Sequence, residues 1–196
     1  MSFESAPEEP LALFQRWFDE AKATGVDQPE TMGLATVDAQ GRPSLRFVLL
    51  KGFDQEGFTF FTNYESRKAG DLDATQEAAL AFYWHAQERQ VRVEGSVRRA
   101  SAEHSDAYFA TRPRGSQLGA WASAQSRLRP EGELEARLRR VEAEFAGKVV
   151  PRPEHWGGYV LHPRRIEFWQ GQPSRLHDRL EYLWMDRSWQ RTSLYP

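Results

Sequence analysis

The segment from Ile166 to Arg179 concentrates charged, aromatic and imidazole side chains around a Gly/Pro turn. Arg175 and His177 are two residues apart, so an extended strand would place both on one face, and Arg179 would continue that face. Guanidinium groups stack on planar rings and bind phosphate as a fork, while imidazole titrates near neutral pH. Such a face suits a planar, anionic heteroaromatic ligand. The alternative is a solvated edge strand with ordinary charges.

Two more segments carry basic residues that could bind phosphate. The stretch from Arg46 to Lys51 sits in a predicted strand, and Ser66-Arg67-Lys68 is expected to begin a helix, whose free N–H groups attract anions. Because Arg46 and Lys51 are five residues apart, an unbroken strand would send them to opposite faces, and only a bulge would let them grip one phosphate. An exposed strand residue and a solvated helix start are the alternatives.

A third group of polar residues lies around a predicted helix end. Tyr108 and Arg112 are four residues apart and therefore share a helix face, and the helix should stop before Pro113. Ser116, beyond this break, could add a hydroxyl group. The three side chains form a candidate second phosphate site, although surface residues of an amphipathic helix would give the same pattern.

Side-chain amides and missing motifs narrow the kind of ligand. Gln90, on a predicted polar strand face, and Gln125-Ser126, in a polar loop, could hydrogen-bond an amide-rich heterocycle. The histidines show no metal-binding spacing such as H-E-x-x-H, so we expect no metal site. The sequence contains no Gly-x-Gly-x-x-Gly, Walker or Gly-x-Ser-x-Gly motif, which disfavours the common dinucleotide, P-loop and hydrolase interpretations.

The composition favours a globular protein of the cytoplasm. With 196 residues and 40% hydrophobic content, we expect a short flexible N-terminus over residues 1–10 and a single domain over residues 11–196. A net charge of −2 argues against a nucleic-acid partner, and the absence of cysteine excludes disulfides and thiolate chemistry. We find no signal-peptide core and no apolar run near the roughly 20 residues of a membrane span.

Short strands with turn signals dominate the elements that must position these side chains. A helix is predicted from Pro10 to about Gly25, and others from a Ser101 cap to about Thr111 and from Pro130 to Phe145. Strands are predicted over 31–37, 44–50, 58–62, 78–84, 90–97, 159–161, 166–169, 179–185 and 189–195. This pattern predicts a mainly antiparallel β fold with flanking helices, closed or partly open as a barrel.

Several blocks of the sequence, taken in order, resemble the pyridoxamine (pyridoxine) 5′-phosphate oxidase family. They are Arg46-Phe47-Val48-Leu49-Leu50-Lys51, Ser66-Arg67-Lys68, Glu88-Arg89-Gln90-Val91, Arg112 to Trp121, Gln125-Ser126, and Phe168-Trp169-Gln170-Gly171 with Arg175-Leu176-His177-Asp178-Arg179. The likeness runs from about Leu11 to the C-terminus. It implies a split β-barrel FMN-binding fold and a homodimer with FMN at the interface, so that each site draws residues from both chains.

The resemblance also divides the candidate residues between cofactor and substrate. Those expected to bind FMN are Arg46, Phe47, Val48, Leu49, Lys51, Phe61, Thr62, Arg67, Lys68, Gln90, Gln125, Ser126, Trp169 and Arg179. Those expected to bind the substrate are Lys51, Tyr108, Arg112, Ser116, Arg175 and His177. Arg175 and His177 would close over the pyridine ring and are the candidate catalytic residues.

The activity implied by the resemblance is FMN-dependent oxidation of pyridoxine or pyridoxamine 5′-phosphate to pyridoxal 5′-phosphate in vitamin B6 biosynthesis or salvage. O2 would accept the electrons and form H2O2. Two alternatives stay open: a related flavin oxidase of another aromatic substrate, as in phenazine biosynthesis, and a non-catalytic module that binds FMN or pyridoxal phosphate. The chain departs from the family in its short acidic N-terminus and in Ser193, where the family tends to have arginine.

Overall fold

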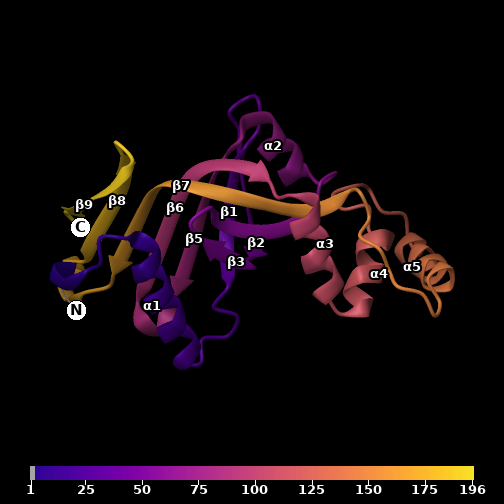
Figure 1. Ribbon diagram of the computed structural model, residues 1–196, viewed down its shortest axis with the longest axis horizontal. Helices are drawn as coiled ribbons and strands as arrows, with labels where there is room; N and C mark the ends of the chain where they lie inside the picture. Colours follow the sequence, from indigo (N-terminus) through magenta and orange to yellow (C-terminus); the bar gives the residue numbers. More distant parts are fainter. Residues whose placement is uncertain (1–2) are drawn as a thin grey trace.

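The computed structural model describes residues 3–196, in which one curled antiparallel sheet is flanked by helices (Figure 1). The strands are β1 Thr31–Val37, β2 Pro43–Leu49, β3 Gly52–Asp54, β4 Gly57–Asn63, β5 Glu77–Trp84, β6 Arg89–Arg99, β7 Trp156–Gln170, β8 Asp178–Met185 and β9 Ser188–Leu194. The helices are α1 Pro10–Ala23, α2 Arg67–Thr75, α3 Ala102–Thr111, α4 Arg114–Ala122 and α5 Glu133–Glu144, with 3₁₀ turns at Phe3–Ser5, His85–Gln87 and Pro173–Arg175.

The order of the strands explains why the sheet closes on itself. Neighbouring strands follow the order β2-β1-β5-β6-β7-β4-β3, and β8 and β9 extend from β7 as a hairpin. β2 and β3 therefore lie at opposite edges, yet only Leu50 and Lys51 connect them. The two edges must meet at this junction, where the Lys51 N–H donates to the carbonyl oxygen of Thr59 on β4 at 2.8 Å. The expected antiparallel, barrel-like architecture is confirmed.

Helix α1 packs its apolar stripe against the inside of the curled sheet. It begins at Pro10, whose missing N–H would have no intrahelical partner in the first turn. The Phe14 ring is fully buried and meets Phe58 and Phe82 edge-on, with ring centroids 5.0 and 5.1 Å apart. This stripe therefore forms part of the main core, and its edge-on ring contacts add to the stabilisation that burial gives.

A second, smaller core holds α3, α4 and α5 together beside the sheet. Its buried members include Phe109 of α3, Leu118 of α4, Val141 of α5 and Trp156 at the start of β7. Helix α4 was not predicted, because Pro113 ends α3 and the following Arg-Gly-Ser run resembles a loop. Proline at the N-cap instead starts a new helix one residue later.

The prediction that Arg175 and His177 share a strand face is wrong. Residues 173–175 form a 3₁₀ turn, in which Ser174 and Arg175 have left-handed φ values of 59° and 61°. β8 begins only at Asp178, so the alternation of a strand does not apply to this pair. Pro173 lacks an N–H group and has a fixed φ, which makes it a poor strand residue and a good turn residue.

The two strands expected over 159–161 and 166–169 are one continuous strand, β7. Its pairing with β6 continues through Pro163 by a register shift between Glu94 and Gly95. A Cβ atom at Gly95 would lie 1.9 Å from the carbonyl oxygen of His162, so only glycine fits this bulge. The strand β3 was also absent from the prediction.

The segment before α1, expected to be flexible, contacts the C-terminal hairpin. The Tyr182 hydroxyl donates to the carbonyl oxygen of Pro7 at 2.6 Å, and Arg191 donates to that of Ala6. Ala6 is buried. Within residues 3–196, we find no helix that is both long enough and apolar enough to cross a membrane.

Candidate functional site

A cavity of about 810 Å³ lies between β2, β4, α2 and the α3–α4 pair. It gathers most of the residues singled out from the sequence: Arg46, Phe47, Val48, Leu49, Lys51, Phe61, Thr62, Arg67, Lys68, Tyr108, Arg112, Ser116, Gln125 and Ser126. Arg46 and Lys51 both line it because β2 ends at Leu49, before the chain crosses to β3. The expected conflict between their strand faces therefore does not arise.

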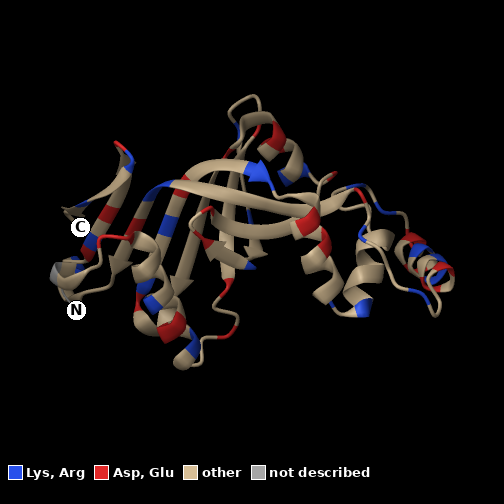
Figure 2. Cartoon of the chain, viewed as in Figure 1, with Lys and Arg blue, Asp and Glu red and all other residues tan. Residues whose placement is uncertain are grey.

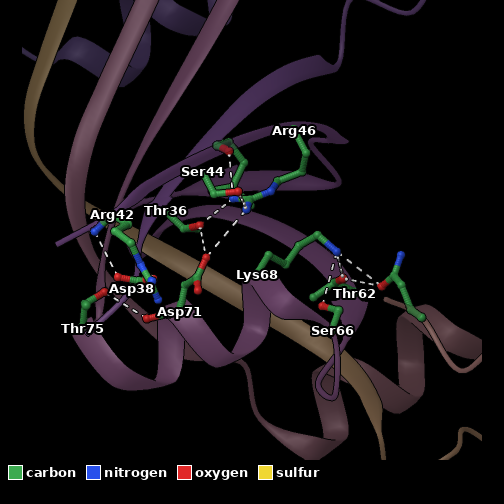
Figure 3. A network of polar contacts seen from close by, with 12 residues as sticks. Thr36, Asp38, Arg42, Ser44, Arg46, Thr62, Ser66, Lys68, Asp71 and Thr75 are labelled. Carbon is green, nitrogen blue, oxygen red and sulfur yellow. Dashed lines mark hydrogen bonds and ion pairs between the residues drawn. The ribbon is translucent and has the colours of Figure 1, made fainter. Parts of the chain in front are cut away.

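Arg46 is held rigidly at one wall of this cavity (Figure 3). Its Nη1 donates to Thr36 Oγ1 at 2.6 Å and to the Leu34 carbonyl oxygen at 3.1 Å, and its Nη2 donates to Ser44 Oγ at 2.8 Å. Asp71 of α2 accepts a 2.6 Å hydrogen bond from Thr36 and lies 3.7 Å from Arg46 Nη2. Burial lowers the pKa of Arg46, and the charge of Asp71 partly opposes that effect.

Lys68 is a buried cation surrounded by neutral oxygen atoms. Its Nζ donates to Thr62 Oγ1 at 3.1 Å and to Ser66 Oγ and Gln125 Oε1, each at 3.3 Å (Figure 3). Only 9% of the residue is exposed. Burial first, and then the positive charge of Arg46, lower the pKa of Lys68. A buried ammonium group without a carboxylate is costly, which favours an anionic ligand here.

The first turn of α2 adds backbone donors beside this lysine. Ser66 is the N-cap residue, but its hydroxyl donates to the Asn63 carbonyl oxygen at 2.7 Å and does not cap the helix. The partial positive charge of the helix N-terminus therefore adds to the charges of Arg67 and Lys68. Three cationic contributions converge on one wall of the cavity, as a phosphate site requires.

Arg112 lies against an aromatic wall on the other side of the cavity. Its guanidinium carbon is 4.5 Å from the centroid of Trp156, a cation–π contact. The rings of Phe61 and Tyr108 are stacked 4.0 Å apart, and Phe61 is also parallel to Trp156. Among residues 3–196, the buried Nη1 of Arg112 has no hydrogen-bond partner. Leaving such a donor unpaired costs roughly 1–3 kcal/mol, so the position favours an acceptor such as phosphate.

Burial shifts the titration of the two polar groups at this wall. It lowers the pKa of Arg112 and raises the pKa of Tyr108, and the two neighbours partly oppose each other's shift. At neutral pH the arginine still carries its charge and the phenol its proton, since both ordinary pKa values lie far from 7. The wall therefore offers charge-assisted and neutral hydrogen-bond donors together.

The remaining predicted residues lie outside this cavity. They are Gln90, Trp169, Arg175, His177 and Arg179, on β6, β7 and β8 and in the turn before β8. Trp169 pairs in register with Gln90 on one side and Arg179 on the other, and its ring centroid is 4.6 Å from that of His177. The β8–β9 hairpin lies at one end of the molecule and α3–α4 at the other (Figure 1).

A second cavity of about 610 Å³ accompanies this group. His177 and Arg179 line it, together with Phe3, Leu176, Asp178, Leu180, Arg191, Ser193, Leu194 and Pro196. The backbone N–H of Gln172 donates to His177 Nδ1 at 3.1 Å, so this ring nitrogen acts as an acceptor. The structure thus separates the candidate residues of one chain into two groups.

Sequence reasoning missed several side chains that shape the site. Trp156 was not among the candidate residues, but it forms part of the cavity wall. Thr36 and Asp71 lie 10 and 25 positions from Arg46 in the sequence. They reach it only through the fold, so no local motif marks them. Ser44 could have been found, because it lies two residues before Arg46 and therefore on the same strand face.

The fold defines the chain as a split-barrel protein. It superposes with a TM-score of 0.73 on a pyridoxamine 5′-phosphate oxidase-related, FMN-binding protein from Nostoc punctiforme, with 18% identity, over 96% of this chain and 98% of that chain. It superposes with a TM-score of 0.94 on PhzG from Burkholderia lata, solved with tetrahydrophenazine-1-carboxylic acid, at 31% identity over 99% and 96% of the two chains.

Sequence comparison identifies the family. The sequence model of the family described as pyridoxamine 5′-phosphate oxidase matches residues 18–145. The family model of the pyridoxine 5′-phosphate oxidase C-terminal dimerisation region matches residues 156–196. The chain is 55% identical to pyridoxine/pyridoxamine 5′-phosphate oxidase of Rubrobacter xylanophilus over 98% of this chain and 89% of that protein. With the same enzyme of Pseudomonas paraeruginosa it shares 54% identity, over 100% and 93%. The chain belongs to the pyridoxine/pyridoxamine 5′-phosphate oxidase family, a family of oxidoreductases.

Proposed function

We propose that the protein oxidises pyridoxine 5′-phosphate or pyridoxamine 5′-phosphate to pyridoxal 5′-phosphate in cytoplasmic vitamin B6 biosynthesis or salvage. FMN is the cofactor, O2 the electron acceptor and H2O2 the second product. The observation that carries this proposal is Arg112, whose buried Nη1 has no partner in the described part of the chain and lies beside stacked aromatic rings. This combination suits a ligand that is both aromatic and phosphorylated. Curated relatives with this activity in their names, at about 55% identity, support it.

The group around Lys68 fits FMN. Arg46, Arg67 and Lys68, with the N-terminus of α2, would hold its phosphate, since they provide fixed positive charge and, within residues 3–196, Asp71 is the one carboxylate that forms an ion pair with them. Thr62, Gln125 and Ser126 would add polar contacts. When bound, the flavin supplies the two-electron acceptor that the protein's own side chains lack. The protein's part is to position the substrate and to neutralise charge.

The group around Arg112 fits the substrate phosphate. Lys51, Tyr108, Arg112 and Ser116 line the same cavity and come from the β2–β3 junction, α3 and α4. Each phosphate carries about −1.5 to −2 charge near neutral pH, so two separate basic groups are needed for two phosphorylated ligands. The two groups of the cavity provide them.

A complete site requires two copies of the chain. Arg175 and His177 lie in the segment just before β8 and are not among the residues that line the cavity. β8 lies at one end of the molecule, and α3 and α4, which line the cavity, lie toward the other (Figure 1). The match to a C-terminal dimerisation region over residues 156–196 supports a homodimer in which this segment reaches the cavity of a second copy. Exposed apolar side chains, including Phe47 at 76% exposure beside the cavity, favour the same arrangement. Arg175 and His177 would then orient the pyridine ring.

Anaerobic reduction of the bound flavin tests the proposal. Pyridoxine or pyridoxamine 5′-phosphate, added to FMN-loaded protein without O2, should bleach the flavin band, and admitting O2 should restore it with formation of H2O2. Bleaching would also exclude a module that only binds FMN or pyridoxal phosphate. A flavin-loaded protein that neither vitamer reduces would refute the proposal.

The second candidate is an oxidase of a phenazine precursor, favoured by the close superposition on PhzG. Charge reversal at Arg112 separates the two candidates. Arg112→Glu should abolish binding of phosphorylated pyridoxine but should leave oxidation of tetrahydrophenazine-1-carboxylic acid largely unchanged. The higher identity to the vitamin B6 oxidases, 55% against 31%, favours the first candidate.

A further inference from the structure

Glu167 is a buried carboxylate at the centre of a cluster of arginines on β6, β7 and β8. Only 3% of the residue is exposed. It forms ion pairs with Arg92 on one neighbouring strand and with Arg179 on the other, and Arg165 lies 3.8 Å away. Glu167 pairs in register with Arg92 and Glu181, so the cluster spans three strands (Figure 2).

The contact with Arg179 is a two-point fork. Arg179 Nε donates to Glu167 Oε1 at 2.9 Å, and Nη2 donates to Oε2 at 3.1 Å. Nη1 donates to the Tyr195 carbonyl oxygen at 2.9 Å. A planar guanidinium with three of its five N–H groups fixed has one orientation, because two parallel hydrogen bonds define its plane. Within residues 3–196, these contacts leave two N–H groups for a ligand.

The balance of charge distinguishes this arginine from Arg112, which lines the cavity. Burial alone would raise the pKa of Glu167, but the hydrogen bonds from Arg179 and Arg92 outweigh burial and hold that pKa below its ordinary value. The carboxylate is therefore charged at neutral pH and neutralises Arg179. What Arg179 offers is a pair of directed N–H donors more than a free positive charge.

We propose that Glu167 is a positioning residue of the FMN site: it fixes the plane of the Arg179 guanidinium so that the two remaining N–H groups are pre-oriented toward the flavin. This inference rests on the proposed function. Without Glu167, Arg179 must lose side-chain freedom when the cofactor binds, and that ordering weakens affinity. Removing the carboxylate therefore weakens FMN binding without removing any residue that touches FMN.

Titration of FMN into FMN-free protein, followed by quenching of flavin fluorescence, tests this role. Glu167→Gln should raise the Kd for FMN about tenfold, which corresponds to about 1.4 kcal/mol. The matched control is Glu181→Gln on the adjacent strand, which removes the contact with Arg165 but leaves the Arg179 fork in place. It should change the Kd less than twofold. Dimer mass and the Tm of the FMN-free protein are measured on each variant.

A double-mutant cycle shows whether the effect runs through Arg179. Arg179→Gln should weaken FMN binding by itself, and adding Glu167→Gln to it should change the Kd less than twofold further. Arg179→Lys, which keeps the charge but not the fork, should weaken binding like Glu167→Gln. If Glu167→Gln fails to fold, Glu167→Asp, which keeps the charge and shortens the reach, should show weaker FMN binding at unchanged dimer mass.

Three results would overturn the inference: wild-type FMN affinity in Glu167→Gln, an equal loss in Glu181→Gln, or an undiminished effect of Glu167→Gln in the Arg179→Gln background. If the folded Glu167→Asp variant binds FMN as tightly as wild type, the inference is also wrong. Failure of the proposed function would look different, because the unaltered protein would then not bind FMN or would not be reduced by either vitamer.

Discussion

The basic residues of the cavity and those of the β6–β8 face differ in their partners. On the β6–β8 face, Arg92, Arg165 and Arg179 each pair with a carboxylate, and acidic and basic residues alternate there (Figure 2). In the cavity, Lys68 and Arg112 form no ion pair with any residue of the described chain 3–196. Sequence alone shows both sets as similar basic residues. Their partners show that Lys68 and Arg112 have charge available for an anion, whereas Arg46, also in the cavity, is paired with Asp71.

The contrast has a consequence for stability. A buried cation with no carboxylate destabilises the FMN-free protein, and a bound phosphate relieves that penalty by mass action. A paired arginine contributes to the folded state whether or not a ligand is present. Substitutions in the two regions should therefore separate ligand binding from stability.

Arg112→Glu should have the largest effect. It removes charge-assisted hydrogen bonds, each worth roughly 1.5–3 kcal/mol, and adds repulsion toward phosphate, so kcat/KM should fall about a hundredfold or more. Steady-state O2 uptake with pyridoxine 5′-phosphate measures it. The charge reversal of Arg137, on exposed α5, is the control and should leave kcat/KM within twofold. Equal losses in both variants would contradict the assignment of Arg112.

Lys68→Met should weaken FMN binding about tenfold to a hundredfold, which corresponds to the free energy of one charge-assisted hydrogen bond. The Tm of the FMN-free protein should not fall, because the substitution removes a buried cation and keeps an apolar chain of similar length. Fluorescence titration and calorimetry check the two parts. Lys22→Met, at the exposed end of α1, is the matched control. A large loss of Tm with unchanged FMN affinity would remove the distinction between the two regions.

Arg165→Met tests the paired region from the opposite direction. It leaves Glu181 and Glu94 without a partner, so the free energy of unfolding should fall by about 1–3 kcal/mol, less than for a fully buried pair because Arg165 is partly exposed. Urea unfolding of the FMN-free protein measures this. The KM for pyridoxine 5′-phosphate should stay within about twofold of that of the unaltered protein, and a tenfold rise would argue that this face also binds substrate.

The smallest effect concerns pH. The folded-state pKa of Glu167 lies below its unfolded value, so its ionic contribution is present above pH 4.5 and is lost as pH falls through the folded pKa. Acid unfolding should therefore be shallower with pH in Glu167→Gln than in the unaltered protein. Urea midpoints measured from pH 6 down to the acid transition compare the two. Parallel curves would show that Glu167 keeps its ordinary pKa.

Periodicity and turn residues predicted most of the sheet, because neighbouring strands such as β1 and β2 are close in sequence. They could not predict that Pro163 lies inside β7, since a bulge at Gly95 on another strand makes this possible. They also suggested an extended backbone across Arg175 and His177, where Pro173 instead starts a turn. A local sequence pattern therefore predicts a strand or a turn reliably only where pairing with a distant strand does not change the outcome.

The candidate residues of the cavity were predicted through ordered motifs, but their partners were not. Asp71 meets Thr36 across 35 positions of sequence, and Gln125 meets Lys68 across 57. Such contacts arise from the closed sheet and not from any local spacing. The same reason kept the unpaired state of Arg112 out of reach, because being unpaired is a property of everything around a residue.

The two-residue junction between β2 and β3 also bears on how the chain folds. Because Leu50 and Lys51 connect the outermost strands of the sheet order directly, bringing these edges together closes almost no loop and loses little chain entropy. The pairing of β6 with β7 is the opposite case, because α3, α4 and α5 lie between them in the sequence. Barrel closure at Lys51 is therefore a local event, and we expect the β6–β7 pairing, with its long intervening segment, to limit the folding rate.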